Sequence, residues 1–153
     1  MAPPITMVRD PAAALAWAER EFERGRMKEG IGFLEQAVAL DGRNVSARIM
    51  LAIAYTRTRQ VELAFQQLER AVEIEPDGFG PQCALGELYH RLAIPEQARW
   101  HLNAALARAV TPTERAYVRG LLREDRARQR RHAPRPSFRQ PFWLLNRARA
   151  EQR

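Results

Sequence analysis

The sequence predicts an all-α fold in which pairs of helices repeat along the chain, and a 34-residue period is the main reason. Two series of like residues show the period: Leu34, Leu68 and Leu102, and Ala37, Ala71 and Ala105. Self-similarity at such a period is typical of stacked supersecondary units. Hydrophobic residues make up 46% of the chain but aromatic residues only 8%, which favours closely packed helices over a β-sandwich.

The spacing of residues within one unit predicts two facing helices. Ala98, Leu102 and Ala105 lie at i, i+4 and i+7, so they share one face of a helix. Leu85-Gly86, followed three residues later by Tyr89, puts two large side chains beside one small position on the preceding helix. The small position allows the next helix to approach closely.

These residues resemble the tetratricopeptide repeat, whose pattern is Leu-Gly, Tyr, Ala, a large residue, Ala and Pro. The unit at 45–78 follows the pattern nearly completely, with Leu51-Ala52, Tyr55, Ala64, Leu68, Ala71 and Pro76. The unit at 79–112 lacks the final proline, and the unit at 11–44 is weaker because Glu21 stands where Tyr is usual. The resemblance covers residues 11–131 and implies a right-handed superhelix of three helix pairs.

The chain thus divides into three repeats, at 11–44, 45–78 and 79–112, flanked by other segments. Residues 1–10 form an extension, 113–131 a C-terminal capping helix, and 132–153 a basic tail rich in proline and arginine. Helix-start signals agree with this division. Asp10-Pro11 and Pro95 predict helix starts, and Thr111 with Glu114 forms a capping box.

The resemblance also implies a concave groove lined by the first helix of each unit, which we expect to bind a partner peptide or helix. The candidate groove residues are Leu15, Glu19, Phe22, Ile49, Ile53, Arg57, Glu87, His90, Arg91, Tyr117 and Leu121. For each apolar member, packing between helices is the alternative to lining an open groove.

One function of the family is excluded on this reading. Heat-shock co-chaperones with these repeats hold a peptide carboxylate through a clamp of Lys, Asn and Arg. The five corresponding positions here are Leu15, Glu19, Met50, Gly80 and Ala84. Because none of them is a cation, we do not expect a carboxylate clamp.

Charge is concentrated at one end of the chain. The whole chain carries a formal charge of +7, yet the stretch from Arg119 onward holds eleven Arg and three acids, a net of +8, which leaves −1 for the rest. The tail after Arg131 adds an apolar cluster. Its candidate docking residues are Arg139, Phe142, Trp143, Leu144, Leu145, Arg147 and Arg149.

Three interpretations of the tail remain open. It docks into a groove, either its own or that of a partner chain, which would allow self-association. Alternatively, it is a flexible solubilising tail, although an exposed Phe-Trp-Leu-Leu cluster would be sticky. In the third, it contacts nucleic acid or an anionic membrane surface through its arginines.

The sequence offers no constellation for catalysis, a metal or a cofactor. Its three histidines lack ligand spacing, and its single cysteine, Cys83, allows no internal disulfide. Neither a secretion signal nor a membrane span is evident, so we expect a cytoplasmic protein. One Lys among 25 basic residues suggests a GC-rich bacterial genome. We expect a protein-interaction scaffold or assembly adaptor; the alternative is a nucleic-acid- or anionic-surface-associated protein acting through the tail.

Overall fold

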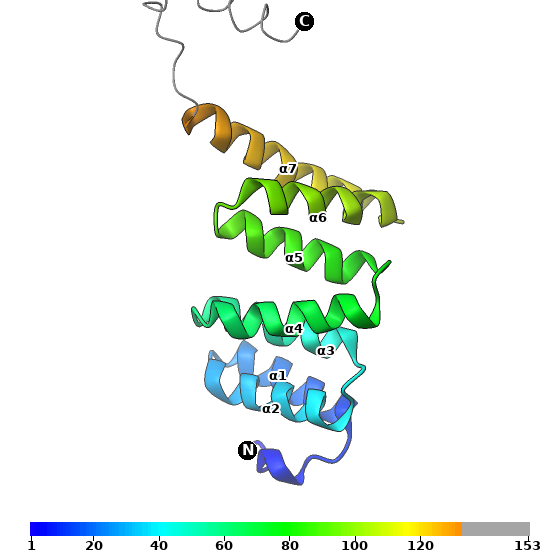
Figure 1. The fold of residues 1–153 in the computed structure, drawn as a ribbon. Coiled ribbons are helices and arrows are strands. Elements are labelled where there is room, and N and C mark those ends of the chain that lie inside the picture. Colours follow the sequence, from blue (N-terminus) through cyan, green and yellow to red (C-terminus); the bar gives the residue numbers. More distant parts are fainter. Residues whose placement is uncertain (133–153) are drawn as a thin grey trace, which may run out of the picture.

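The computed structural model describes residues 1–132, which form one short 3₁₀ helix and seven α-helices and contain no β-strand (Figure 1). The elements are η1 (Ile5–Met7), α1 (Pro11–Glu23), α2 (Met27–Leu40), α3 (Val45–Arg57), α4 (Val61–Ile74), α5 (Phe79–Arg91), α6 (Pro95–Arg108) and α7 (Pro112–His132). The candidate tail-docking residues, between Arg139 and Arg149, lie outside the described residues.

The helices stack in sequence order as antiparallel pairs, with α1 on α2, α3 on α4 and α5 on α6 (Figure 1). The first helices begin at 11, 45 and 79, and the second helices at 27, 61 and 95, so both recur every 34 residues. Contacts of α2 with α3, α4 with α5 and α6 with α7 join the pairs into one stack. The sequence period is therefore the period of the fold.

The turn inside each pair repeats the same backbone conformation. Gly25, Arg59 and Ala93 have φ values of 75°, 63° and 57°. In the first turn Gly25 N–H donates to the Phe22 carbonyl (2.9 Å) and Arg26 N–H to the Glu21 carbonyl (2.8 Å), the pattern of a Schellman motif. The other two turns make the equivalent bonds. Only the first uses glycine, the residue that adopts positive φ without strain.

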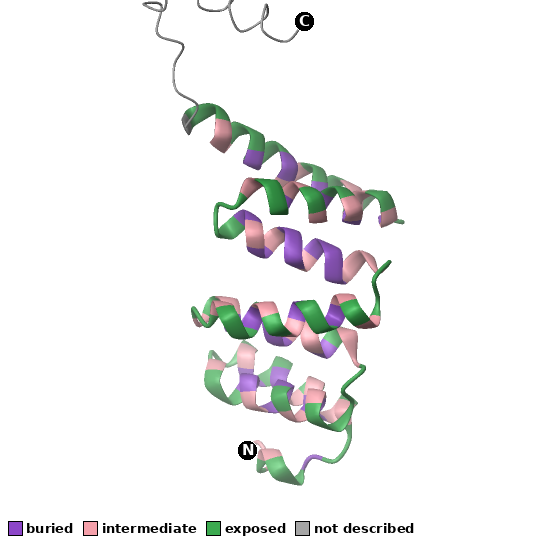
Figure 2. Ribbon diagram, viewed as in Figure 1, coloured by how far each residue is buried: buried purple, intermediate pink, exposed green. Residues whose placement is uncertain are grey.

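Small residues bring the paired helices together, and buried residues lie between neighbouring helices (Figure 2). Ala64, Ala98 and Gly86 are fully or nearly fully buried at these contacts. A Cβ placed on Gly86 would lie 2.7 Å from Leu102 Cγ and 3.0 Å from the Leu102 backbone nitrogen. The glycine therefore permits the observed distance between α5 and α6.

The first unit departs from the others at the position where they carry tyrosine. Glu21 is fully buried, and its carboxylate accepts hydrogen bonds from Arg24 (2.7 Å) and Arg26 (3.4 Å). In the second unit, Tyr55 donates its hydroxyl hydrogen to Glu35 (2.6 Å). The buried charge at Glu21 is thus paired by two arginines of the adjoining turn, as a buried carboxylate requires.

Side-chain caps form at two of the three predicted helix starts, whereas α6 begins at Pro95 without one. Asp10 accepts from the N–H groups of Ala12 (3.4 Å) and Ala13 (3.0 Å). Before α7, Glu114 N–H donates to Thr111 Oγ1 (3.1 Å) while Thr111 N–H donates to Glu114 Oε2 (2.9 Å), which is a reciprocal capping box. Backbone N–H groups of Thr111 and Val110 lower the pKa of the Glu114 carboxyl.

Candidate peptide-binding groove

Two adjoining hollows lie on the surface formed by the first helices, and they share Ile53 and Arg57 of α3. Ile53 is 47% exposed although it lies within the packed helix α3. Its neighbours Ala52 and Ala54 are buried, so Ile53 marks the side of α3 that faces away from the core. The two hollows meet at this side chain.

The first hollow, of about 200 Å³, lies where α1, α2 and α3 meet. Its lining is mostly apolar: Phe22, Met27, Met50, Ile53, Ala54 and Arg57. Gly30 of α2 makes room for the Phe22 ring, because a Cβ there would lie 2.3 Å from Phe22 Cε1. The first repeat thus accommodates a large aromatic side chain at the edge of the hollow.

The second hollow, of about 160 Å³, lies between α3 and α5 and reaches down to Leu68 of α4. Its remaining lining residues are Ala52, Ile53, Thr56, Arg57, Ala84, Glu87, Leu88 and Arg91. Both arginines are exposed, whereas Leu88 and Ala52 are buried in the floor. This hollow therefore combines an apolar floor with a mainly basic rim.

Glu87 ties the rim to α7. Its carboxylate accepts from Arg91 Nη2 (2.8 Å) on its own helix and from the Tyr117 hydroxyl (2.7 Å) on α7. Burial and this bond to Glu87 raise the pKa of Tyr117, so the hydroxyl remains a donor. Because Glu87 is already engaged twice, Arg57 is the rim charge left open to a ligand in the described residues.

Cys83 lies beside this cluster and is 7% exposed. Burial, followed by the negative charges of Glu87 and Glu114, raises the pKa of its thiol to about 11. A thiol that stays protonated at neutral pH is a poor nucleophile. Cys83 therefore acts as a small packing residue at this site.

The structure brings together five of the predicted groove residues, namely Phe22, Ile53, Arg57, Glu87 and Arg91, around the two hollows. Five others line neither hollow: Leu15, Glu19, Ile49, Tyr117 and Leu121. Leu15, Ile49 and Leu121 are partly buried against core residues, which is the packing alternative considered for the apolar members. Tyr117 still borders the groove through its bond to Glu87.

The placement of His90 on the open groove is wrong. His90 is 5% exposed and lies against α7, with Nδ1 3.8 Å from Asp125 Oδ1 and Nε2 3.4 Å from Glu124 Oε2. Its carbonyl accepts from Arg128 Nη1 (2.8 Å). Residues 124–128 of α7 cover this position, and the sequence pattern alone does not show that they approach His90.

Sequence reasoning also missed several lining residues, among them Met27, Met50, Ala84 and Leu88. Met27 is the first residue of α2, whereas the family resemblance implies a groove lined by the first helix of each pair. A methionine near the predicted groove was an available signal, because flexible thioether side chains are frequent on surfaces that bind varied partners.

Residues 1–132 contain neither a candidate metal site nor a membrane-spanning helix. No group of three or more His, Cys, Asp or Glu side chains there is arranged to hold a metal ion. Likewise, none of the described helices combines the length and apolar character that crossing a bilayer requires.

Solved structures with the same fold include three in which a peptide or a partner region is bound. The first tetratricopeptide domain of Spaghetti (RPAP3), bound to the HSP90 peptide SRMEEVD, has a TM-score of 0.68 at 18% identity, covering 78% of this chain and 92% of that one. The Yersinia enterocolitica type III secretion chaperone SycD, with a peptide of the translocator YopD, has a TM-score of 0.68 at 12% identity, covering 77% and 93%. PcrH with the chaperone-binding region of PopD has a TM-score of 0.68 at 16% identity, covering 77% and 92%.

At these identities the likeness establishes the fold, which confirms the predicted all-α superhelix of helix pairs. No curated protein sequence matches the chain. The family model described as "Tetratricopeptide repeat" matches residues 21–82, a range that runs from the end of α1 into α5. The chain therefore matches the tetratricopeptide-repeat family model over residues 21–82 and shares the fold of solved tetratricopeptide-repeat structures.

Proposed function

We propose that this protein is an interaction scaffold or assembly adaptor that binds a partner peptide or helix across the two hollows. The observation that carries the proposal is the exposure of Ile53 at the point where they meet. An exposed apolar side chain between concave, apolar-floored surfaces is the usual anchor site for a peptide side chain.

The lining indicates what kind of peptide fits. Two bulky apolar side chains, spaced to enter one hollow each, would contact Ile53 from both sides. The Met27 and Met50 side chains can adjust to different anchors, because thioethers are flexible and polarizable. An acidic residue near the second anchor would pair with Arg57 at the rim.

The peptide-bound neighbours support binding of a segment rather than of a small molecule. They do not support an HSP90-type ligand for this chain, because its clamp positions, Leu15, Glu19, Met50, Gly80 and Ala84, hold no cation. The proposal also includes docking of the arginine-rich tail onto a groove, in cis or on a partner chain, and action in the cytoplasm.

Substitution of Ile53 tests the groove. A peptide would be selected from a random displayed library on the full chain, and its affinity measured by calorimetry. Ile53→Asp should weaken binding at least about 100-fold, because it places a carboxylate at the anchor position and removes a central apolar contact. Helical circular dichroism should stay unchanged, since Ile53 is half exposed.

Ile94→Asp is the matched control. Ile94 is 38% exposed and lies at the N-cap of α6, away from both hollows, where Asp is well tolerated. This variant should bind the peptide as the unchanged chain does. Equal binding by the Ile53→Asp variant would show that the groove is not the site.

A further inference from the structure

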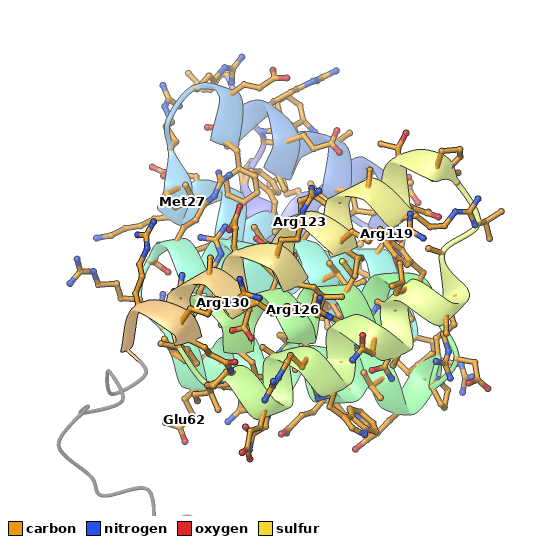
Figure 3. The ribbon with its side chains drawn as sticks, turned by 90° about the horizontal axis from the view of Figure 1, so that it is seen from above. Met27, Glu62, Arg119, Arg123, Arg126 and Arg130 are labelled. Atoms are coloured by element: carbon orange, nitrogen blue, oxygen red, sulfur yellow. The ribbon has the colours of Figure 1, made fainter. Side chains whose placement is uncertain are left out.

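Helix α7 carries a row of four arginines along one face, Arg119, Arg123, Arg126 and Arg130 (Figure 3). They lie at i, i+4, i+7 and i+11, so at 3.6 residues per turn they share a sector of about 60° and span about 16 Å. All four are exposed. Three of them, with Ala127, border a shallow hollow of about 360 Å³.

The row carries charge of one sign. The acidic residues Glu124 and Asp125 point away from it, about 100° or more around the helix from the nearest arginine of the row. Both approach His90 instead, and Asp125 is 2% exposed. Within residues 1–132, none of the four arginines forms an ion pair with a carboxylate.

The position of the row in the repeat explains why this face is open. Arg119 and Arg123 lie 34 residues after Leu85 and Tyr89, which α5 uses to pack against its neighbours. No second helix follows α7 within the described residues. In the part of the chain that the structure describes, the face that would receive such a helix is therefore uncovered, and an extended ligand can reach it.

A solubilising cap does not require this pattern. Mixed charges keep an end face soluble, whereas like charges at i and i+4 repel each other and destabilise the helix. Arg119 with Arg123 and Arg126 with Arg130 are two such pairs. The tail cannot neutralise the row either, because five further arginines and only one acid, Glu151, follow His132. A polyanion relieves this repulsion.

We propose that the arginine row of α7 binds the phosphate backbone of double-stranded nucleic acid without reading its sequence. The planar guanidinium group donates two parallel hydrogen bonds to a phosphate. A rigid row about 16 Å long meets the regular phosphates of a duplex better than those of a flexible strand. No aromatic side chain lies on the row to stack on unpaired bases, and no large apolar side chain lies there to enter a membrane.

The test compares the full chain with two variants that lose the same charge. The first replaces all four row arginines by glutamine, which keeps helix propensity. The control replaces Arg9, Arg20, Arg43 and Arg59 by glutamine; these four are exposed and lie outside α7. Binding to fluorescent DNA and RNA duplexes is followed by anisotropy from 50 to 200 mM salt. Four phosphate contacts should contribute about −3.6 to the slope of log affinity against log salt concentration. Their share of the affinity should therefore fall ~100-fold over this salt range.

The proposal expects the row variant to lose that part of the slope and to bind more than about tenfold more weakly, with the control near the unchanged chain. Affinity should not depend on duplex sequence. Equal losses of affinity in both variants would overturn the proposal, because binding would then depend on net charge alone. No loss in the row variant would also overturn it, because another part of the chain, such as the tail, would then bind the duplex. Preference for phosphatidylserine vesicles over duplexes would also overturn it. The Ile53→Asp variant should retain duplex binding, so failure here is separate from failure of the groove.

Discussion

Helices α5 and α7 occupy the same phase of the repeat, but within residues 1–132 only α5 is followed by a second helix that packs on it. The shared positions hold Leu85 and Tyr89 in α5 and Arg119 and Arg123 in α7. Leu85 is 4% exposed, and the Tyr89 ring packs between Phe65 and His101, whereas both arginines are exposed. Large apolar residues at these two positions are therefore needed to pack against a second helix. They are not needed for the first helix to form, because α7 is helical without them.

The two helices also end differently. After Arg91 the chain reverses through Ala93, at φ 57°, to begin α6. The equivalent residue in α7, Ala127, is helical, and α7 continues to His132. The turn is thus needed only where a second helix must return along the first. The extra length of α7 supplies Arg130 of the arginine row and Arg128, which binds the His90 carbonyl.

Placing the residue of one helix at the equivalent position of the other should give the largest change in stability. Leu85→Arg would bury a guanidinium without a partner and remove an apolar side chain, so we expect a loss of about 4 kcal/mol or more in the free energy of unfolding. Arg119→Leu should change it by no more than about 0.5 kcal/mol, because the site is exposed. Urea denaturation measures both. A tolerated Leu85→Arg would contradict the burial of this face.

Gly86 of α5 and Gly120 of α7 occupy equivalent positions, and replacing each by alanine should change stability in opposite directions. At Gly120 nothing lies within 4 Å of an added Cβ, so Gly120→Ala should raise stability by about 1 kcal/mol through helix propensity. At Gly86 the added Cβ meets Leu102, and overpacking should outweigh that gain and lower stability by about 1 kcal/mol. Denaturation midpoints of the two variants are compared with the unchanged chain. Changes of the same sign would mean that α5 and α6 do not approach as closely as the structure shows.

Much of the fold was predictable because its determinants are local or periodic. The series through Leu34 and Ala37 fixed the period, and Asp10, Pro95 and Thr111 marked helix starts where the structure has them. The sequence did not predict why the Glu21 carboxylate can be buried. It depends on Arg24 and Arg26 reaching back across the turn, a matter of side-chain geometry.

The candidate site was only partly predictable. Ile53 followed from its place on the first helix of a repeat, but Met27 lines the hollow from a second helix, and His90 is covered by α7. The spacing of the arginine row was visible in the sequence. The sequence does not show which face of α7 is exposed, because that depends on how α7 packs against α5 and α6.

The smallest change in stability that we predict concerns the N-terminal caps of α5 and α7. At Gly78, α5 has no side-chain cap, whereas α7 has the Glu114 carboxylate accepting from two backbone N–H groups. Because these bonds lower the pKa of Glu114, its contribution to stability is complete above the usual pKa of about 4.5 and is lost as the pH falls through the lower pKa of the folded protein.

Glu114→Gln tests this contribution, because glutamine keeps an accepting oxygen but carries no charge. Its melting temperature should therefore lie slightly below that of the unchanged chain at pH 7, and the gap should close toward pH 3. Glu96→Gln, in the first turn of α6, controls for removal of a charge from a helix start. A gap that stays constant with pH would show that the capping box stabilises α7 through its geometry alone, and the ionised carboxylate would then not distinguish the start of α7 from that of α5.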